Sequence, residues 1–174
     1  GKKITVQYEL KDDSYLIESK ILLNDYFLGN EEILLTWVNN LKHQESNSTN
    51  EKNQTRINFF NLDGEFDYTS ATSTDNQEIK VEEKLKWISN KQQFFSSAIL
   101  TNNTFNNSHL KSEYVEDEII NKKFTIKTEI PIENNSITYQ YYFGPNKYSI
   151  LKNIENEFHN NLYLGWIGVG GFNR

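Results

Sequence analysis

Three histidines, His43, His109 and His159, are the residues best suited to acid–base or metal chemistry in this sequence. An imidazole titrates near neutral pH and is a common metal ligand. None of the three has a second histidine or a carboxylate at the spacing that zinc sites use. The chain has no cysteine, which excludes disulfides, thiolate catalysis and cysteine-ligated metal centres. We therefore predict structural or solvent roles for the histidines, with no catalytic residue, no metal site and no cofactor.

Carboxylates are the other candidates for chemistry, and they gather at Glu113, Glu116, Asp117 and Glu118. A pair of carboxylates can hydrolyse a glycosidic bond, but a charged run of this kind is more typical of a solvated strand end. Asp63-Gly64-Glu65 superficially resembles a calcium loop, yet it lacks the regular acidic ligands before the glycine and predicts a turn. No Gly-x-Ser-x-Gly nucleophile motif occurs. The sequence predicts that the chain is not an enzyme.

Charge and composition limit the kinds of partner. The net charge is −6, the pI is about 5.1, and the lysines are scattered among acidic residues. Nucleic-acid-binding domains carry a basic stripe, so we predict no nucleic-acid partner. An acidic body is also repelled by anionic lipid head groups. No apolar run reaches the length of about 18 residues that spans a bilayer. With neither methionine nor cysteine, we interpret the chain as a piece excised from an exported protein.

Alternation of apolar and polar residues dominates the first 143 residues and predicts strands. Ile4, Val6, Tyr8 and Leu10 indicate a half-buried strand, and residues 15–23 complete a hairpin with it. Further strands are expected around 33–39, 57–62 and 66–68, with the last two joined by the Asp63-Gly64 turn. Residues 43–54 are nearly all polar, so we expect a mobile loop there.

The second half of the chain contains two well-alternating segments, 124–130 and 137–143. We expect these to be adjacent antiparallel strands joined by a turn at 133–136. Tyr139, Tyr141 and Phe143 fall on one face of the second segment. They could form an exposed platform for a sugar or a peptide, but we favour a place in the core of a sandwich.

The period changes after Pro145, which suits the first position of a helix. Tyr148, Leu151, Ile154 and Phe158 recur at steps of three and four and predict one packing face of a helix over about 145–161. The fold class expected from the residues is therefore all-β, mainly an antiparallel sandwich, whole or partial, with one C-terminal α-helix.

The end of the chain is rich in glycine and apolar residues, among them Gly165, Trp166, Ile167 and Phe172, and it closes on Arg174. Glycine weakens a helix, whereas tryptophan favours the membrane–water interface. We therefore expect two parts, a sandwich domain over 1–162 and a hinge over 163–174 that lies close to a membrane.

Three segments carry a resemblance to a known family: WISNKQQFFSSAIL at 87–100, YYFGPNKYSILKNI at 141–154 and LGWIGVGGFNR at 164–174. Their types and order resemble the periplasmic domain of YidC-type (YidC/Oxa/Alb) bacterial membrane protein insertases. The resemblance implies a β-supersandwich on the periplasmic side of the inner membrane. It also implies that the helix after Pro145 and the hinge lead toward a transmembrane core absent from this chain.

The resemblance further implies a function in protein transport. The parent protein would insert and fold nascent membrane proteins, with the Sec translocon and SecDF as partners. A carbohydrate-binding or mutarotase-like sandwich is the alternative, because similar folds serve both functions. A mutarotase requires a histidine and a carboxylate together in a cleft. A third possibility is a chaperone-like groove for unfolded peptide, which a cleft lined by aromatic side chains and free of charge would favour.

Overall fold

The computed structural model describes residues 3–24, 31–44, 48–70, 76–117 and 119–162. Within them, ten antiparallel strands form a sheet that folds into two layers, so the predicted antiparallel β-sandwich is confirmed. The first layer has the order β1 (Lys3–Leu10), β2 (Leu16–Asn24), β10 (Ser136–Pro145), β8 (Phe95–Tyr114), β7 (Leu85–Lys91), β4 (Arg56–Asn61) and β5 (Phe66–Tyr68). The second has the order β3 (Glu32–Lys42), β9 (Ile120–Pro131), β8 and β6 (Gln77–Val81).

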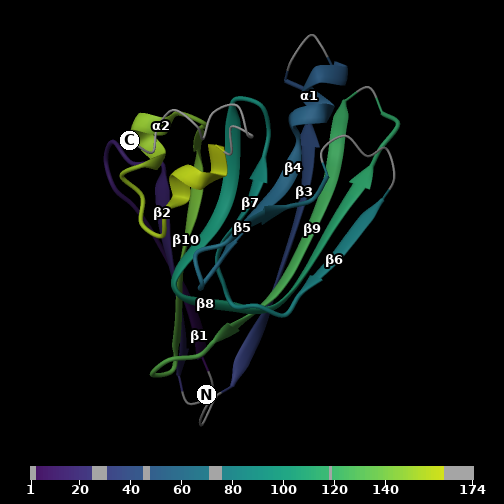
Figure 1. Cartoon of the computed structure of the whole chain (residues 1–174). Coiled ribbons are helices and arrows are strands. Elements are labelled where there is room, and N and C mark those ends of the chain that lie inside the picture. Colours follow the sequence, from purple (N-terminus) through teal and green to yellow (C-terminus); the bar gives the residue numbers. More distant parts are fainter. Residues whose placement is uncertain (1–2, 25–30, 45–47, 71–75, 118, 163–174) are drawn as a thin grey trace.

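Strand β8 belongs to both layers, because its 20 residues are long enough to cross from one to the other. Its first half pairs with β10 and β7, and its second half pairs with β9 and β6. The change of layer coincides with a register shift between Asn106 and His109 and with a positive φ of 46° at Asn107. A bulge of this kind increases local twist and bends a strand. The two layers consequently diverge from one end of the molecule to the other (Figure 1).

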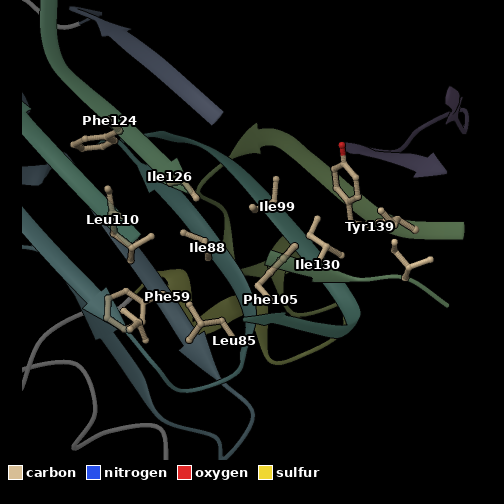
Figure 2. Packing of buried hydrophobic residues seen from close by; sticks show 14 of the residues in the cluster. Phe59, Leu85, Ile88, Ile99, Phe105, Leu110, Phe124, Ile126, Ile130 and Tyr139 are labelled. Atoms are coloured by element: carbon tan, nitrogen blue, oxygen red, sulfur yellow. The ribbon is translucent and has the colours of Figure 1, made fainter. Parts of the chain in front are cut away.

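The main core lies between the layers. Alternation places Phe124, Ile126 and Ile130 of β9 on the inner face of the second layer, opposite Ile88 and Ile99 of the first. Their side chains, with those of Phe59, Leu85, Phe105 and Leu110, fill the space between the sheets (Figure 2). The alternating pattern in the sequence therefore reports the buried face of these central strands correctly.

A second core covers the opposite face of the first layer. Trp87 and Tyr142 point to that face, where they meet Leu151 and Phe158 from the C-terminal segment. This segment contains the short helix α2 (Tyr148–Leu151) and the 3-10 helix η1 (Phe158–Leu162). The central strands of the first layer are thus covered on both faces, by the second layer and by the C-terminal segment.

Two hairpins follow the prediction. β1 pairs with β2 across the turn at 11–14, and β4 pairs with β5 across Asp63-Gly64. Gly64 has a φ of +88°, in the region that a glycine enters without steric cost.

The expected half-burial of β1 is wrong. Ile4, Val6, Tyr8 and Leu10 are between 48% and 65% exposed. β1 pairs with β2 alone and forms the edge of the first layer, and no described residue of the second layer buries its apolar face. The alternation therefore predicted the strand and the common direction of these side chains correctly. It could not show whether a second layer lies opposite them.

The expected adjacency of 124–130 and 137–143 is also wrong. These segments are β9 and β10, which lie in different layers: β9 pairs with β3 and β8, whereas β10 pairs with β2 and β8. The turn between them does exist, with a bridge between Glu133 and Ser136. This turn joins the two layers, because β9 and β10 each pair with other strands and not with one another.

The predicted mobile loop over 43–54 is replaced in part by helix α1 (Ser48–Gln54). Its buried anchor is Glu51, which is 1% exposed and whose carboxylate accepts hydrogen bonds from His43 Nδ1 and from the backbone N–H of Gln44, each at 2.9 Å. Burial of one polar residue through hydrogen bonds leaves no apolar pattern for a sequence analysis to detect.

The continuous helix predicted over 145–161 is wrong as well. Pro145 ends β10, α2 has only four residues, and η1 follows after a turn. Asn156 and Glu157 adopt φ angles of +58° and +52°, which a helix excludes. The break is stabilised from outside the segment, because the Asn156 carbonyl oxygen accepts a hydrogen bond of 2.9 Å from the Trp87 indole N–H. No helix in the described part of the chain has the length and apolar character needed to cross a bilayer.

Candidate binding cleft and C-terminal cap

The histidines are each held in a local pair. His43 binds the buried Glu51, and His109 Nε2 lies 2.6 Å from a carboxylate oxygen of Glu78. The ring of His159 packs edge-on against Tyr148 at 5.8 Å between centroids. Sequence spacing did not reveal the two carboxylate partners, because Glu51 reaches His43 through a helix and Glu78 reaches His109 from a neighbouring strand. Among the described residues, no three side chains of His, Asp or Glu are placed to hold a metal ion.

In the acidic run near residue 115, described carboxylates make local contacts within the fold. Glu113 forms an ion pair of 2.9 Å with Lys111. Asp117 accepts hydrogen bonds from the backbone N–H groups of Ile119 and Ile120, and these bonds lower the pKa of its carboxyl group. These carboxylates stabilise a strand end and the turn after it.

Residues 148–162 form a unit that we call the C-terminal cap. Of the predicted packing face, Leu151 and Phe158 are fully buried and Ile154 packs against them, but Tyr148 is 58% exposed. Phe158 is held between two aromatic rings of the first layer, with centroids 5.2 Å from Trp87 and 5.1 Å from Tyr142. Three of the four predicted residues therefore contact the sandwich, although they do so from a broken helix.

Buried amides add polar contacts beneath the cap. Asn161 is fully buried, and its Nδ2 donates to Ser96 Oγ at 2.9 Å. Asn58 Nδ2 in turn donates to the backbone and side-chain oxygens of Asn161, at 3.1 and 3.0 Å. Buried polar groups that are paired in this way fix a single arrangement, so the cap is docked in a defined position on β4 and β8.

A cleft opens between the layers at the end where they diverge. Its volume is about 620 Å³. Its walls come from the end of β3 in the second layer, from the start of β8 and the end of β10 in the first layer, and from the segments next to these strands. The lining residues are Tyr15, Asn39, Asn40, Leu41, Lys42, Gln44, Gln92, Phe95, Ser96, Ser97, Phe143, Gly144 and Pro145. The divergence itself is visible between the ends that carry α1 and α2 (Figure 1).

The cleft continues an aromatic series that begins in the core. Tyr139 is buried, Tyr141 is half-buried and Phe143 is 48% exposed, so successive residues on one face of β10 pass from the core to the cleft. Trp37 of β3 packs edge-on against Tyr141 and Phe143, at 5.9 and 6.4 Å. The expectation that this face is core is thus right for Tyr139 and wrong for Phe143.

The charge of the cleft is low. Lys42 is the only ionisable group with a formal charge near neutral pH among its lining residues, and the polar remainder is amides and hydroxyls. A mutarotase-like reaction needs an imidazole and a carboxylate in the cleft, and these lining residues include neither. Elsewhere, burial and the neighbouring Arg56 lower the pKa of Lys91 to about 8, while burial and Lys52 do the same for Lys122.

Sequence reasoning missed most of the cleft. Tyr15, Asn39, Phe95 and Phe143 come from four separate segments, and only Phe143 was singled out as an exposed aromatic candidate. The predicted hinge residues Gly165, Trp166, Ile167, Phe172 and Arg174 lie outside the described residues, so the hinge remains a prediction.

Fold and site define this chain as a two-layered antiparallel β-sandwich with a docked C-terminal segment and a cleft of low charge. Comparison with known proteins narrows this class. Residues 1–169 match the family model described as the YidC periplasmic domain. The chain therefore belongs to the family of periplasmic domains of YidC membrane protein insertases.

Curated relatives agree with the family. The chain is 29% identical over 162 residues to the membrane protein insertase YidC of Azobacteroides pseudotrichonymphae, a match that covers 89% of this chain and 26% of the relative. It is 28% identical over 191 residues to that of Cytophaga hutchinsonii, covering all of this chain and 31% of the relative. For Parabacteroides distasonis the identity is 26%, over 89% of this chain and 25% of the relative. The chain thus spans about a quarter to a third of these relatives.

Proposed function

We propose that this chain is a non-catalytic domain of a membrane protein insertase, and that it supports the insertion and folding of inner-membrane proteins. It would orient the parent protein and offer surfaces to partners, namely the Sec translocon and SecDF. The match of residues 1–169 to the periplasmic-domain family is the observation that carries this proposal. The family implies nascent membrane proteins as the clients of the parent, which this domain meets from the periplasmic side.

The docked cap supports a mechanical role. Leu151, Phe158 and Asn161 are fully buried against the sandwich, so a force or rotation applied to the cap is transmitted to the first layer. We propose that the cap is the coupling element between the sandwich and the membrane part of the parent. The segment 163–174, with Trp166 and its neighbouring glycines, would act as a hinge that becomes ordered beside the bilayer.

Site-specific photo-crosslinking in the full-length parent tests the partner contacts. A crosslinking amino acid is placed at Tyr148 or Lys152 on the exposed side of the cap, and at Lys80 of β6 as the matched control on the far layer. We expect adducts with SecDF or the translocon from the cap and none from Lys80. Equal adducts from all three positions, or none from the cap, would contradict the proposed contacts.

An insertion assay tests the coupling. Replacing Gly165 and Gly168 by alanine in the parent should stiffen the proposed hinge and slow insertion of a membrane protein. The stability of the domain should stay unchanged, because the two described cores are built from residues up to Leu162. A fully active variant would remove the hinge from the proposal.

A further inference from the structure

The cleft between the layers has the composition of a binding site for polypeptide. We infer that it binds an extended, uncharged, apolar segment of an unfolded chain. This inference rests on the proposed function, because an insertase handles clients of that chemistry. It goes further than that function by giving the domain a client-binding site of its own.

Exposed aromatic rings provide the apolar contacts. Tyr15, Phe95 and Phe143 line the cleft and are 45%, 49% and 48% exposed. Rigid aromatic side chains bury a large area at low cost in conformational entropy, and they are frequent anchors at binding sites. Phe143 is also fixed in place, since its ring stacks on Tyr141 at 5.7 Å with an interplanar angle of 20°. The cleft therefore presents pre-positioned apolar anchors to its occupant.

The polar groups of the cleft match a peptide better than a sugar. Asn40, Gln44 and Gln92 are amides, which both donate and accept hydrogen bonds, as a peptide group does. Sugar hydroxyls are commonly bound by carboxylates, and the lining residues include none although the chain has 24 acidic residues. An apolar segment without charge thus enters this cleft without repulsion and without leaving a carboxylate desolvated.

A buried amide behind the cleft wall is a second and independent observation. Asn90 is 1% exposed, and neither amide atom has a hydrogen-bond partner among the described residues. It lies in register with Ser97, which lines the cleft, and it shares with Ile88 the face of β7 that points between the layers. Unpaired buried amides are costly and uncommon in native proteins. Asn90 does not line the cleft itself, so it would pair with a bound peptide group only if the wall at Ser97 shifts on binding.

Fluorescence anisotropy with a labelled peptide tests the inference on the 174-residue chain. The probe is a fluorescein-labelled decapeptide in which leucine alternates with serine, and the control probe carries glutamate in place of leucine. Phe95→Ser and Phe143→Ser should each weaken binding by about tenfold or more, as expected for an anchor residue. Phe94→Ser is the matched control, because Phe94 is 51% exposed and adjacent in sequence but does not line the cleft.

Equal affinity of the three variants would overturn the inference, and so would equal binding of the glutamate probe. Displacement of the peptide by maltoheptaose would show a sugar site instead. Concentration-dependent dimerisation that Phe143→Ser abolishes would show that a second copy occupies the cleft. The proposed function is tested separately, since loss of crosslinks to partners in the parent does not alter peptide binding by this chain.

Discussion

Removing the ring of Phe158 should destabilise the domain strongly, although the residue lies near the end of the described chain. The side chain is fully buried and touches the rings of Trp87 and Tyr142. Truncation of a buried phenylalanine to alanine costs about 3–5 kcal/mol. The cap can also detach from the sandwich without unfolding the rest of the domain. The variant therefore cannot lose more stability than the free energy with which the cap docks on the sandwich. We therefore expect Phe158→Ala to lower the free energy of unfolding by about 3 kcal/mol.

The matched control is Tyr148→Ala. Tyr148 was placed on the same packing face by the sequence pattern, yet it is 58% exposed, so its truncation should cost less than about 1 kcal/mol. Urea titration followed by far-ultraviolet circular dichroism measures both variants. For a domain of this size, a loss of about 3 kcal/mol also lowers the melting temperature by about 6–12 °C.

The result that would refute this reasoning is an equal loss in the two variants. It would mean that the cap packs as the uninterrupted helix that the sequence pattern predicts, with all four residues in equivalent positions. Hydrogen exchange gives a second measurement: Phe158→Ala should accelerate exchange in η1 and in the first half of β8, but not in β9, which makes no pairing with the cap.

Three further predictions concern stability. Lys91 and Lys122 have a pKa of about 8 in the folded chain and 10.5 in the unfolded chain. Between these pH values the unfolded chain binds more protons than the folded chain, so stability should rise from about pH 8 toward pH 10. Burial raises the pKa of Tyr141 and Tyr142. Above about pH 10 the folded chain therefore retains protons that the unfolded chain loses, and stability should fall. Urea titrations across this pH range check both the rise and the fall, and Lys91→Met should flatten the rise. Gly144→Ala should cost about 1–3 kcal/mol, because its Cβ would lie 2.7 Å from Tyr142 Oη and 2.8 Å from Tyr15 Cδ1; an unchanged melting temperature would contradict it. Glu51→Ala should leave the partners of its carboxylate unpaired and cost about 1–3 kcal/mol of stability. Hydrogen exchange should become faster only in α1 and in the segment around His43. The control Glu78→Ala, at the more exposed pair with His109, should cost far less.

The relation between pattern and structure differs between the centre and the edges of the sandwich. In β9, Phe124, Ile126 and Ile130 alternate in the sequence and are buried in the structure. In β1, Ile4, Val6 and Tyr8 alternate equally well and are exposed. Alternation depends on side-chain direction, which is local. Burial depends on whether another layer lies opposite, and that is decided by strands far away in the chain.

The sequence by itself determined the all-β class, the hairpins at 11–14 and at Asp63-Gly64, and the apolar positions Leu151, Ile154 and Phe158, because each of these follows from local geometry or from the period of apolar residues. It also carried the family, through short segments whose residue types and order are characteristic.

Only the tertiary structure decided the pairing of the strands, the break in the C-terminal helix and the cleft. The partners of β9 and β10 depend on where β8 crosses between the layers, and the break at Asn156 depends on a hydrogen bond from Trp87, 69 residues earlier in the chain. The cleft gathers Tyr15, Asn39, Phe95 and Phe143 from four strands or strand ends. Contacts over such sequence separations leave no periodic signal, since periodicity records the neighbours along one strand or helix and not those across the fold.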